Sequence, residues 1–252
     1  MIQTIEHGPI RELRLARPPA NALSPELIAA LRDAVLASGE GGARAIVLSG
    51  APGRFSGGLD VPHLLTLDRA AIAATWRDFY GMMRALAASP VPIAAALTGH
   101  SPAGGAVISL FCDYRVMAEG DYRIGLNEVQ VGLPIPPVIH TALRRVVGDR
   151  LAERLVVTGA LIPAAEAARI GLVDELAPLE QVVERAVEWC RSVLTLPPGA
   201  VAETRRIARA SLIQSFDEAG EAEVQKVLND WFSPETQGAM QALVERLAKK
   251  KG

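Results

Sequence analysis

VPIAAALTGHSPAGGAVISLFCDY, residues 91–114, is the stretch that decides the fold. Residues 91–97 form an apolar run before Gly99, and a run of that length predicts a strand buried on both faces. Residues 101–105 have turn composition, and residues 106–112 are apolar all round, which predicts a buried helix. A helix that opens on two glycines presents bare backbone N–H groups at the positive end of its dipole. This loop therefore suits an anion, or an oxygen that becomes one during a reaction.

The composition indicates a globular protein with a sizeable core. The chain has 252 residues, 50% of them hydrophobic, which suffices for one large domain with or without an appendage. A formal net charge of -2 argues against the basic surface of a nucleic-acid binder. The N-terminal residues show no signal or transit peptide, and no apolar run reaches the roughly 18 residues of a membrane span. We therefore expect a cytoplasmic protein, or a mitochondrial matrix protein if the chain is a processed eukaryotic one, with no nucleic-acid partner and no membrane span.

The order of the expected elements predicts an α/β body followed by a helical tail. Strand and helix patterns alternate up to about residue 195, and only helical patterns follow the turn at Leu196-Pro197-Pro198-Gly199. The body is therefore expected over residues 1–195 and the helical region over residues 196–252. Expected elements include strands at 2–15, 45–49 and 172–176, helices that begin after Ser24 and Asp68, and tail helices at 199–213, 216–231 and 234–249.

Residues 99–103, GHSPA, approximate the G-x-S-x-G turn that carries the nucleophile of serine hydrolases. Pro102 argues against that chemistry, because the residue after the nucleophile must donate its backbone N–H to the oxyanion, and proline has none. A phosphate-binding loop is also excluded, since Gly105-Ala106 stands where Lys-Ser/Thr is required. The four histidines form no ligand cluster, so we expect no metal site.

Two glycine-rich loops and one carboxylate remain as candidate machinery. Residues 56–58 and 103–105 each follow an expected strand, and Glu128 is the third member of the set. One interpretation is structural, with the glycines in tight turns and Glu128 on the surface. The other is an oxyanion hole made of two backbone N–H groups from separate loops, with Glu128 as a nearby base. Spacing alone does not decide between the two.

Three motifs in this order resemble the enoyl-CoA hydratase/isomerase (crotonase) superfamily. They are PANAL at 19–23, FSGGLD at 55–60 and GHSPAGG at 99–105, the last followed by Cys112-Asp113, and the similarity runs essentially end to end. The resemblance implies an α/β fold, a crotonase-like spiral of ββα turns, with a C-terminal helical region that forms a homotrimer or a dimer of trimers. It also implies an acyl-CoA thioester substrate and no cofactor, since coenzyme A is part of the substrate.

By motif position, the resemblance implies that the backbone N–H groups of Gly57 and Gly104 are the oxyanion donors and that Glu128 is the base. The other residues implied at the substrate are Ala20, Ala22, Leu23, Ser56, Gly58, Leu59, Asp60, Gly105, Val107 and Asn127. Asp60 equally suits the ordering of its own loop. Arg17, next to the first motif, suits either a CoA phosphate or solvent.

The carboxylates decide the chemistry within this family. The hydratases hold water with two glutamates, of which the first falls on Val107 here and the second on Glu128. The pattern therefore resembles the Δ3,Δ2-enoyl-CoA isomerases of the mitochondrial type. The expected reaction converts a 3-enoyl-CoA into trans-2-enoyl-CoA in fatty-acid β-oxidation. Alternatives are an enoyl-CoA hydratase or another crotonase-type acyl-CoA enzyme and, in a different class, a non-catalytic acyl-CoA-binding or assembly subunit. The proline-rich residues 133–137 depart from the isomerase pattern and leave the acyl chain length open.

Overall fold

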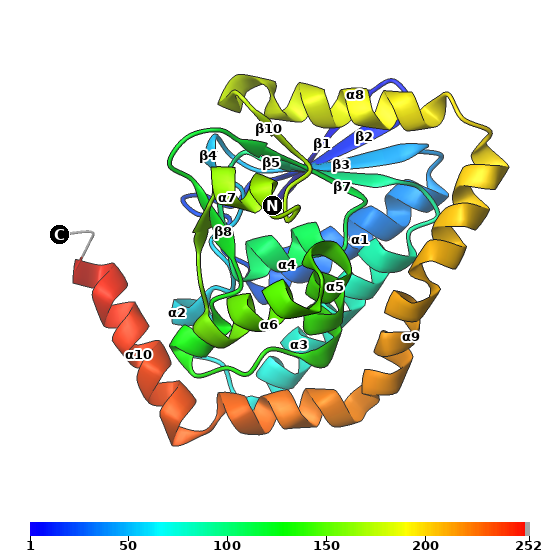
Figure 1. Cartoon of the computed structure of the whole chain (residues 1–252). Coiled ribbons are helices and arrows are strands. Elements are labelled where there is room, and N and C mark those ends of the chain that lie inside the picture. Colours follow the sequence, from blue (N-terminus) through cyan, green and yellow to red (C-terminus); the bar gives the residue numbers. More distant parts are fainter. Residues whose placement is uncertain (250–252) are drawn as a thin grey trace.

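A computed structural model describes residues 1–249 (Figure 1). The chain forms two β-sheets, and helices connect and cover their strands. The larger sheet has the order β1-β2-β3-β5-β7-β10 and the smaller one β4-β6-β8-β9. The strands of the larger sheet are β1 (Ile2–His7), β2 (Ile10–Leu15), β3 (Ala45–Ser49), β5 (Ile93–Leu97), β7 (Tyr114–Ala118) and β10 (Glu175–Ala177). Those of the smaller sheet are β4 (Gly53–Arg54), β6 (Gly99–Pro102), β8 (Arg123–Gly125) and β9 (Ile162–Pro163). Neighbours run parallel, except β1 with β2 and β8 with β9.

The chain builds both sheets by repeating one turn of structure. A strand of the larger sheet (β3, β5 or β7) is followed by one of the smaller sheet (β4, β6 or β8) and then by helix. The helices of the body are α1 (Pro25–Glu40), α2 (Val61–Leu64), α3 (Arg69–Ala88), α4 (Gly104–Leu110), α5 (Pro137–Val147), α6 (Asp149–Thr158), α7 (Ala164–Arg169) and α8 (Val182–Leu194), with short 3₁₀ turns η1 (Glu128–Val131) and η2 (Leu179–Gln181). This repetition confirms the predicted α/β spiral of ββα turns.

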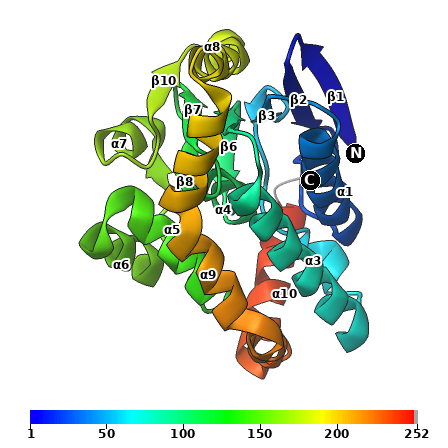
Figure 2. The ribbon, with the colours of Figure 1, turned by 90° about the vertical axis from the view of Figure 1, so that its right-hand side faces the viewer.

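The larger sheet is buried on both faces because its strands alternate between two hydrophobic cores. In β3, Ala45 and Val47 belong to the cluster that contains the buried face of α8. Ile46 and Leu48 belong to the cluster that contains α1, α3 and α4. Figure 2 shows α8 on one side of the sheet and these helices on the other. The predicted buried strand at 91–97 is β5, in which every residue is buried.

The predicted helix starts are confirmed by their caps. The Ser24 hydroxyl oxygen accepts the Leu27 N–H at 3.3 Å at the start of α1, and Pro25 occupies the first helical position. The Asp68 carboxylate accepts the Ala71 N–H at 2.8 Å at the start of α3.

The strand predicted at 172–176 is displaced, since β10 begins only at Glu175. The N–H groups of Leu172 and Val173 donate instead to the carbonyl oxygen of Ala167, which completes the end of α7. The turn predicted to begin at Ser101 is also displaced, because Ser101 and Pro102 belong to β6.

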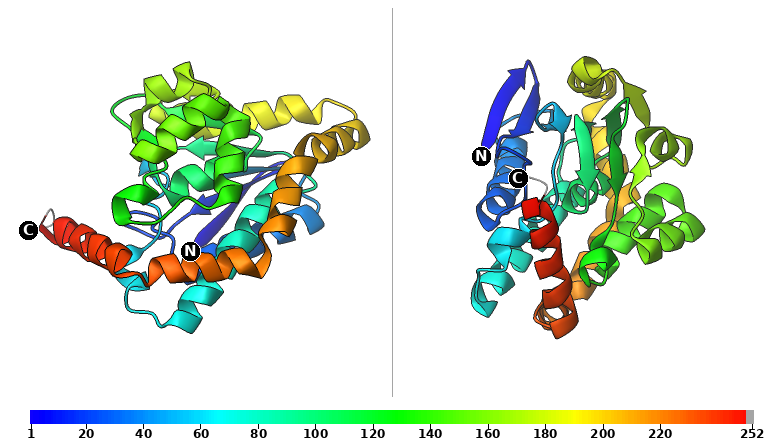
Figure 3. Two further views of the ribbon diagram at one scale, coloured as in Figure 1. Left: turned by 60° about the horizontal axis from the view of Figure 1, so that its bottom comes forward. Right: turned by 90° about the vertical axis from the view of Figure 1, so that its left-hand side faces the viewer.

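Within the described residues the tail contains three helical segments, as predicted, but the first break lies at a different residue. α9 (Pro198–Trp231) passes through the predicted break near 214 and bends instead at Gly220, where φ is +52° and ψ is -161°. A residue without Cβ adopts that backbone conformation at least cost. α10 (Pro234–Lys249) follows as predicted. Residues 250–252 of the predicted tail lie outside the described residues. Figure 3 shows α9 and α10 running around the body, from the end of α8 to the side opposite to it.

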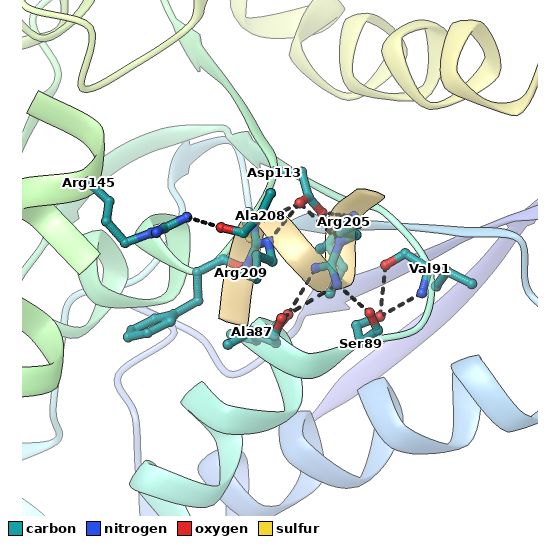
Figure 4. Close-up of polar contacts among 12 residues, drawn as sticks. Ala87, Ser89, Val91, Asp113, Arg145, Arg205, Ala208 and Arg209 are labelled. Atoms are coloured by element: carbon teal, nitrogen blue, oxygen red, sulfur yellow. Dashed lines mark hydrogen bonds and ion pairs between the residues drawn. The ribbon is translucent and has the colours of Figure 1, made fainter. Parts of the chain in front are cut away.

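Asp113 attaches α9 to the body through two arginines whose side chains are each only 10% exposed (Figure 4). The Nε atoms of Arg205 and Arg209 each lie 3.0 Å from Asp113 Oδ1, and Asp113 Oδ2 accepts the Ile93 N–H at 2.8 Å. Arg205 also donates to carbonyl oxygens at the end of α3, and Arg209 donates to Phe111 O at 2.8 Å. The tail is thus tied to the end of α3, the start of β5 and the end of α4. The division into a body and an oligomerisation region near residue 195 stays a prediction.

Candidate active site

The carboxyl ends of β4, β6 and β8 meet at one edge of the smaller sheet, because these three strands are parallel neighbours. The loops that leave this edge carry residues 55–60, 103–105 and 126–128. A cavity of about 500 Å³ lies against them and extends to α3, α9 and α10. It is lined by five predicted site residues: Gly57, Leu59, Gly104, Asn127 and Glu128. A larger and more open hollow of about 670 Å³ lies between α8 and α9 and contains none of them.

The first two motifs form one interlocked unit beside this cavity. Leu23 and Gly58 are joined by a backbone hydrogen bond of 2.8 Å, and the Ser56 hydroxyl donates to Asn21 O at 2.8 Å. Asn21 in turn donates from its side chain to Phe55 O at 3.1 Å. These contacts fix the second loop relative to the first, so the position of Gly57 depends on both.

Gly104 lies at a strained turn between β6 and α4. The preceding residue, Ala103, has φ +46° and ψ -117°, a conformation that costs a residue with a Cβ about 1–3 kcal/mol. A Cβ on Gly104 would lie 2.5 Å from Leu23 Cδ1 and 3.3 Å from Gly58 Cα, so a larger residue here would displace the Leu23 side chain or the turn. Within the described chain, the Gly104 N–H has no hydrogen-bond acceptor. It is therefore available at the cavity, at the N-terminal end of α4.

Gly57 lines the same cavity, but its N–H already has an acceptor. It donates to the carbonyl oxygen of Ala20 at 2.8 Å. Gly57 can therefore act on a substrate oxygen only by sharing its hydrogen between two acceptors or after the bond to Ala20 opens. The two predicted donors, Gly57 and Gly104, thus lie at one cavity. Among the described residues the Gly104 N–H has no acceptor, whereas the Gly57 N–H is hydrogen-bonded to Ala20 O.

Glu128 begins the 3₁₀ turn η1, and two residues separate it from the end of β8. Its Oε2 atom is buried without a hydrogen-bond partner among the described residues, and the same is true of Asn127 Oδ1. Burial raises the pKa of Glu128 to about 7, because the ionised form loses its hydration. A carboxylate whose pKa lies near neutrality accepts and returns protons efficiently. The structure thus contradicts the alternative in which Glu128 is a solvated surface residue.

The other predicted substrate residues support the loops and do not line the cavity: Ala20, Ala22, Leu23, Ser56, Gly58, Asp60, Gly105 and Val107. Asp60 caps α2 by accepting the His63 N–H at 3.3 Å and pairs with Arg17 at 2.6 Å. These contacts agree with the alternative that Asp60 orders its loop. Arg17 also donates to Ala22 O at 3.0 Å, so its guanidinium group is occupied within the first motif.

Val107 requires a correction. Its side chain is 1% exposed and belongs to the hydrophobic core, and the described lining of the cavity does not include it. The reason is that α4 is buried on every side, so this position faces its neighbours in the core. Ser101 is likewise 0% exposed and donates its hydroxyl to Gly99 O at 3.1 Å, which agrees with the exclusion of a serine nucleophile.

Two features of the cavity were not predicted from the sequence: an apolar wall and a row of basic side chains. The wall is formed by Trp76 and Phe79 of α3, Leu133, Ile139, Val227 of α9, and Leu243 and Leu247 of α10. The spacing of the two aromatic residues on α3 indicates a shared helix face, but not which cavity that face meets. The basic residues are Arg54, His100 and Arg123. Leu133, Pro134 and Pro136 also line the cavity, as expected for the proline-rich segment.

Two negative findings apply to residues 1–249. No group of three or more His, Cys, Asp or Glu side chains is placed to hold a metal ion. No helix in this part of the chain has both the length and the hydrophobicity needed to cross a bilayer.

The chain is similar over most of its length to known proteins. Residues 6–251 match the family model described as enoyl-CoA hydratase/isomerase. The mitochondrial enoyl-CoA delta isomerase 1 of Homo sapiens is 32% identical, over 95% of this chain and 80% of the relative. A probable enoyl-CoA hydratase of Mycobacterium avium is 34% identical, over 77% of this chain and 75% of the relative.

The fold agrees with these sequence matches. The crystal structure of human mitochondrial delta3-delta2-enoyl-CoA isomerase superposes with a TM-score of 0.95 at 30% identity, covering 100% of this chain and 99% of that one. With the spiral of ββα turns, the two glycine loops at one cavity and the match over nearly the whole sequence, this protein belongs to the enoyl-CoA hydratase/isomerase family.

Proposed function

We propose that this protein is a Δ3,Δ2-enoyl-CoA isomerase that uses Glu128 as its single catalytic base. The observation that carries the proposal is Glu128, whose pKa is raised to about 7 and whose buried Oε2 atom has no hydrogen-bond partner among residues 1–249, in the cavity that also exposes the Gly104 N–H. Asp230 is the other carboxylate in the described lining, but it comes from α9 and not from the loops of the small sheet.

In the proposed reaction, Glu128 removes a proton from C2 of the 3-enoyl thioester. The electrons of the C–H bond form a dienolate, whose negative charge rests largely on the thioester oxygen. The Gly104 N–H donates to that oxygen, and one such donor contributes about 3 kcal/mol of transition-state stabilisation. The protonated Glu128 then returns the proton to C4, which leaves the double bond between C2 and C3 and restores the carboxylate.

The apolar wall supports isomerisation over hydration, because a dienolate in a dry cavity is protected from protonation by water. One observation favours hydration as the second candidate. Asn127 Oδ1 is a buried acceptor without a partner next to Glu128 in sequence, and two such oxygen atoms suit a bound water. The similarity to a probable hydratase adds to this alternative.

One assay separates the candidate functions. Purified protein is given a 3-enoyl-CoA and, separately, a 2-enoyl-CoA, and the products are separated by chromatography. We expect 2-enoyl-CoA from the first and little 3-hydroxyacyl-CoA from the second. Faster hydration than isomerisation would replace the proposal by the hydratase, and binding without turnover would replace it by a non-catalytic acyl-CoA-binding subunit. The homotrimer or dimer of trimers, the absence of a cofactor and the cytoplasmic or mitochondrial location stay predictions.

Gly104→Ala tests the oxyanion donor. The added Cβ collides with Leu23 Cδ1, so we expect the turn to shift and kcat to fall about 10²-fold, by analogy with the loss of one oxyanion donor. Leu23→Val removes the colliding Cδ1 atom, so the double variant should regain at least tenfold of the lost kcat. The Leu23→Val single variant is the control. Equal kcat values for Gly104→Ala and the wild type would contradict the expected shift of the turn and show that the Leu23 side chain alone makes room for the Cβ.

A further inference from the structure

The loop that carries Glu128 sets the position of this residue through its backbone. The Leu133 N–H donates to Glu128 O at 3.1 Å and the Gly132 N–H donates to Val129 O at 3.2 Å, so residues 128–133 close on themselves. Among residues 1–249, Glu128 Oε2 has no hydrogen-bond partner, and the one hydrogen bond that lowers the pKa of this carboxyl comes from its own backbone. The place of the carboxylate in the cavity therefore depends on where the loop lies.

The end of α6 lies in close contact with this loop. Gln130 Nε2 donates to Gly159 O at 2.9 Å. Gly159 has φ +59°, and a Cβ on it would lie 2.7 Å from Val129 Cγ2 and 3.4 Å from Asn127 Cα. The backbone at the end of α6 thus approaches the loop as closely as a residue without Cβ allows, and it blocks movement of the loop in that direction.

The first turn of α10 holds the C-terminal end of the same loop. Thr236 Oγ1 donates to Gly132 O at 2.7 Å, and a Cβ on Gly132 would lie 3.0 Å from Thr236 Cα. The start of α10 orients this hydroxyl, since Ser233 Oγ donates to Thr236 Oγ1 at 3.0 Å and accepts the Thr236 N–H at 3.2 Å. Thr236 is buried, so removing its hydroxyl would leave Gly132 O without this donor in a place that water does not readily reach.

The face of α10 that contains Thr236 also builds the wall of the cavity. Thr236, Met240, Leu243 and Leu247 follow one another at intervals of four, three and four residues, which places them on one side of the helix. The first two are buried, and the last two line the cavity. Docking of this face therefore closes the cavity and brings the Thr236 hydroxyl to the loop of Glu128 in one step.

We propose that Thr236 is a positioning residue, which holds the loop through Gly132 O and so places the Glu128 carboxylate for proton transfer. This inference rests on the proposed function, in which Glu128 is the catalytic base. Thr236 is not part of the described lining of the cavity, so it acts on the substrate only through the loop. The base must reach the proton at C2 and then C4, and a displacement of about 1 Å lowers such a rate by about 10²-fold.

The experiment compares two removals of the hydroxyl with its conservative replacement. Thr236→Val keeps the branching and size of the side chain, and Thr236→Ser keeps the hydroxyl. Thr236→Ala also removes the hydroxyl and has a higher helix propensity, so it gives the same test if Thr236→Val folds poorly. Thr204→Val is the matched control, since it makes the same change at an exposed position on α9 outside the catalytic cavity.

Three quantities are measured on each variant: kcat and KM for a 3-enoyl-CoA, the melting temperature, and the titration of the Glu128 carboxyl by NMR of isotopically labelled glutamate. The resonance is assigned by its loss in Glu128→Gln. No variant of Thr236, Ser233 or Thr204 changes the other charged or titratable groups in the described lining, which are Arg54, His100, Arg123 and Asp230.

We expect Thr236→Val to lower kcat by about tenfold or more, with a KM within about twofold of the wild type, because the apolar wall is kept. Thr236→Ser and Thr204→Val should retain the wild-type kcat. A displaced loop admits water to Glu128, so its pKa should fall below about 7 in Thr236→Val, and the acidic limb of kcat/KM should move to lower pH.

Ser233→Ala separates positioning from stability. It removes the cap of α10 but keeps the bond from Thr236 to Gly132, so it should lower the melting temperature and leave kcat and the Glu128 titration unchanged. Equal losses of kcat in Ser233→Ala and Thr236→Val would overturn the inference, as would a wild-type kcat in Thr236→Val.

The proposed function fails by a different result, namely wild-type turnover in Glu128→Gln or no isomerisation by the wild type. The NMR titration still decides the inference in that case, because it reports the surroundings of Glu128 without any reaction. An unchanged Glu128 titration in Thr236→Val would then show that Thr236 does not hold the loop.

Discussion

Glu128→Gln is expected to reduce the kcat for isomerisation by about 10²–10⁴-fold, the usual contribution of general-base catalysis. The amide is nearly isosteric with the carboxylate but cannot accept the C2 proton. Because the side chain keeps its size and position after β8, the KM should change little. The measurement is initial rates on a 3-enoyl-CoA, with Glu153→Gln as a control of the same chemical change at an exposed site on α6. Turnover near the wild-type value would show that another group removes the proton.

The same variant has a defined pH signature. The pKa of Glu128 is raised from 4.5 to about 7 in the folded protein, so wild-type kcat/KM should fall tenfold per pH unit below about 7, as the base becomes protonated. In the unfolded chain Glu128 loses its proton near its ordinary pKa. The folded state therefore binds more protons between pH 4.5 and 7, and its stability decreases as the pH rises through that window. Glu128→Gln should remove the activity limb and be more stable than the wild type at pH 8.

Asp113→Ala is expected to reduce the free energy of unfolding by about 3–5 kcal/mol, the usual cost of leaving buried charges unpaired. Arg205 and Arg209 are each 10% exposed and share this one carboxylate, whose own exposure is 17%. Removing it also leaves the Ile93 N–H at the start of β5 without its acceptor. The two lost ion pairs and the lost acceptor all lie where α9 meets the body, so their loss should lower the stability of the whole fold.

Urea denaturation at fixed protein concentration measures this loss, since association would otherwise shift the midpoint. Asp113→Asn retains an oxygen for Ile93 and should cost less than Asp113→Ala. Glu166→Ala is the matched surface control: it removes a carboxylate from the ion pair with the exposed Arg169 and should cost less than about 1 kcal/mol. If Asp113→Ala were no worse than Glu166→Ala, the arginines would not depend on Asp113.

The larger sheet and the long helices could be predicted from the sequence because their signals are local. β5 is a continuous apolar run, and α1 and α3 begin at capping side chains. The smaller sheet as a whole could not be predicted in this way, although the sequence indicates a short strand at 122–124, where β8 lies. β4 has 2 residues, β6 has 4 and β8 has 3, too few for a period of two to be visible. These strands exist because of pairing between segments that are far apart in sequence.

The sequence predicted those residues of the candidate site that belong to recognisable motifs. The two glycine loops and Glu128 are brought to one cavity as expected. What the motifs could not show is how each group is used inside the fold. The Gly57 N–H is bonded to Ala20 because the loop before α1 folds against it, and Val107 is turned into the core because α4 is covered on all sides. Both features depend on tertiary packing, so the identity of the residues alone does not reveal them.

The wall supplied by α10 has a consequence for the order in which the protein matures. Leu243 and Leu247 complete the cavity, yet the ribosome adds them only after the glycine loops and Glu128. Because chains begin to fold from their N-terminal segments during synthesis, the glycine loops and Glu128 are assembled before this wall exists. The nascent chain therefore holds an unfinished pocket open to water, and the enclosed pocket appears only once α10 has been synthesised and has packed against the body.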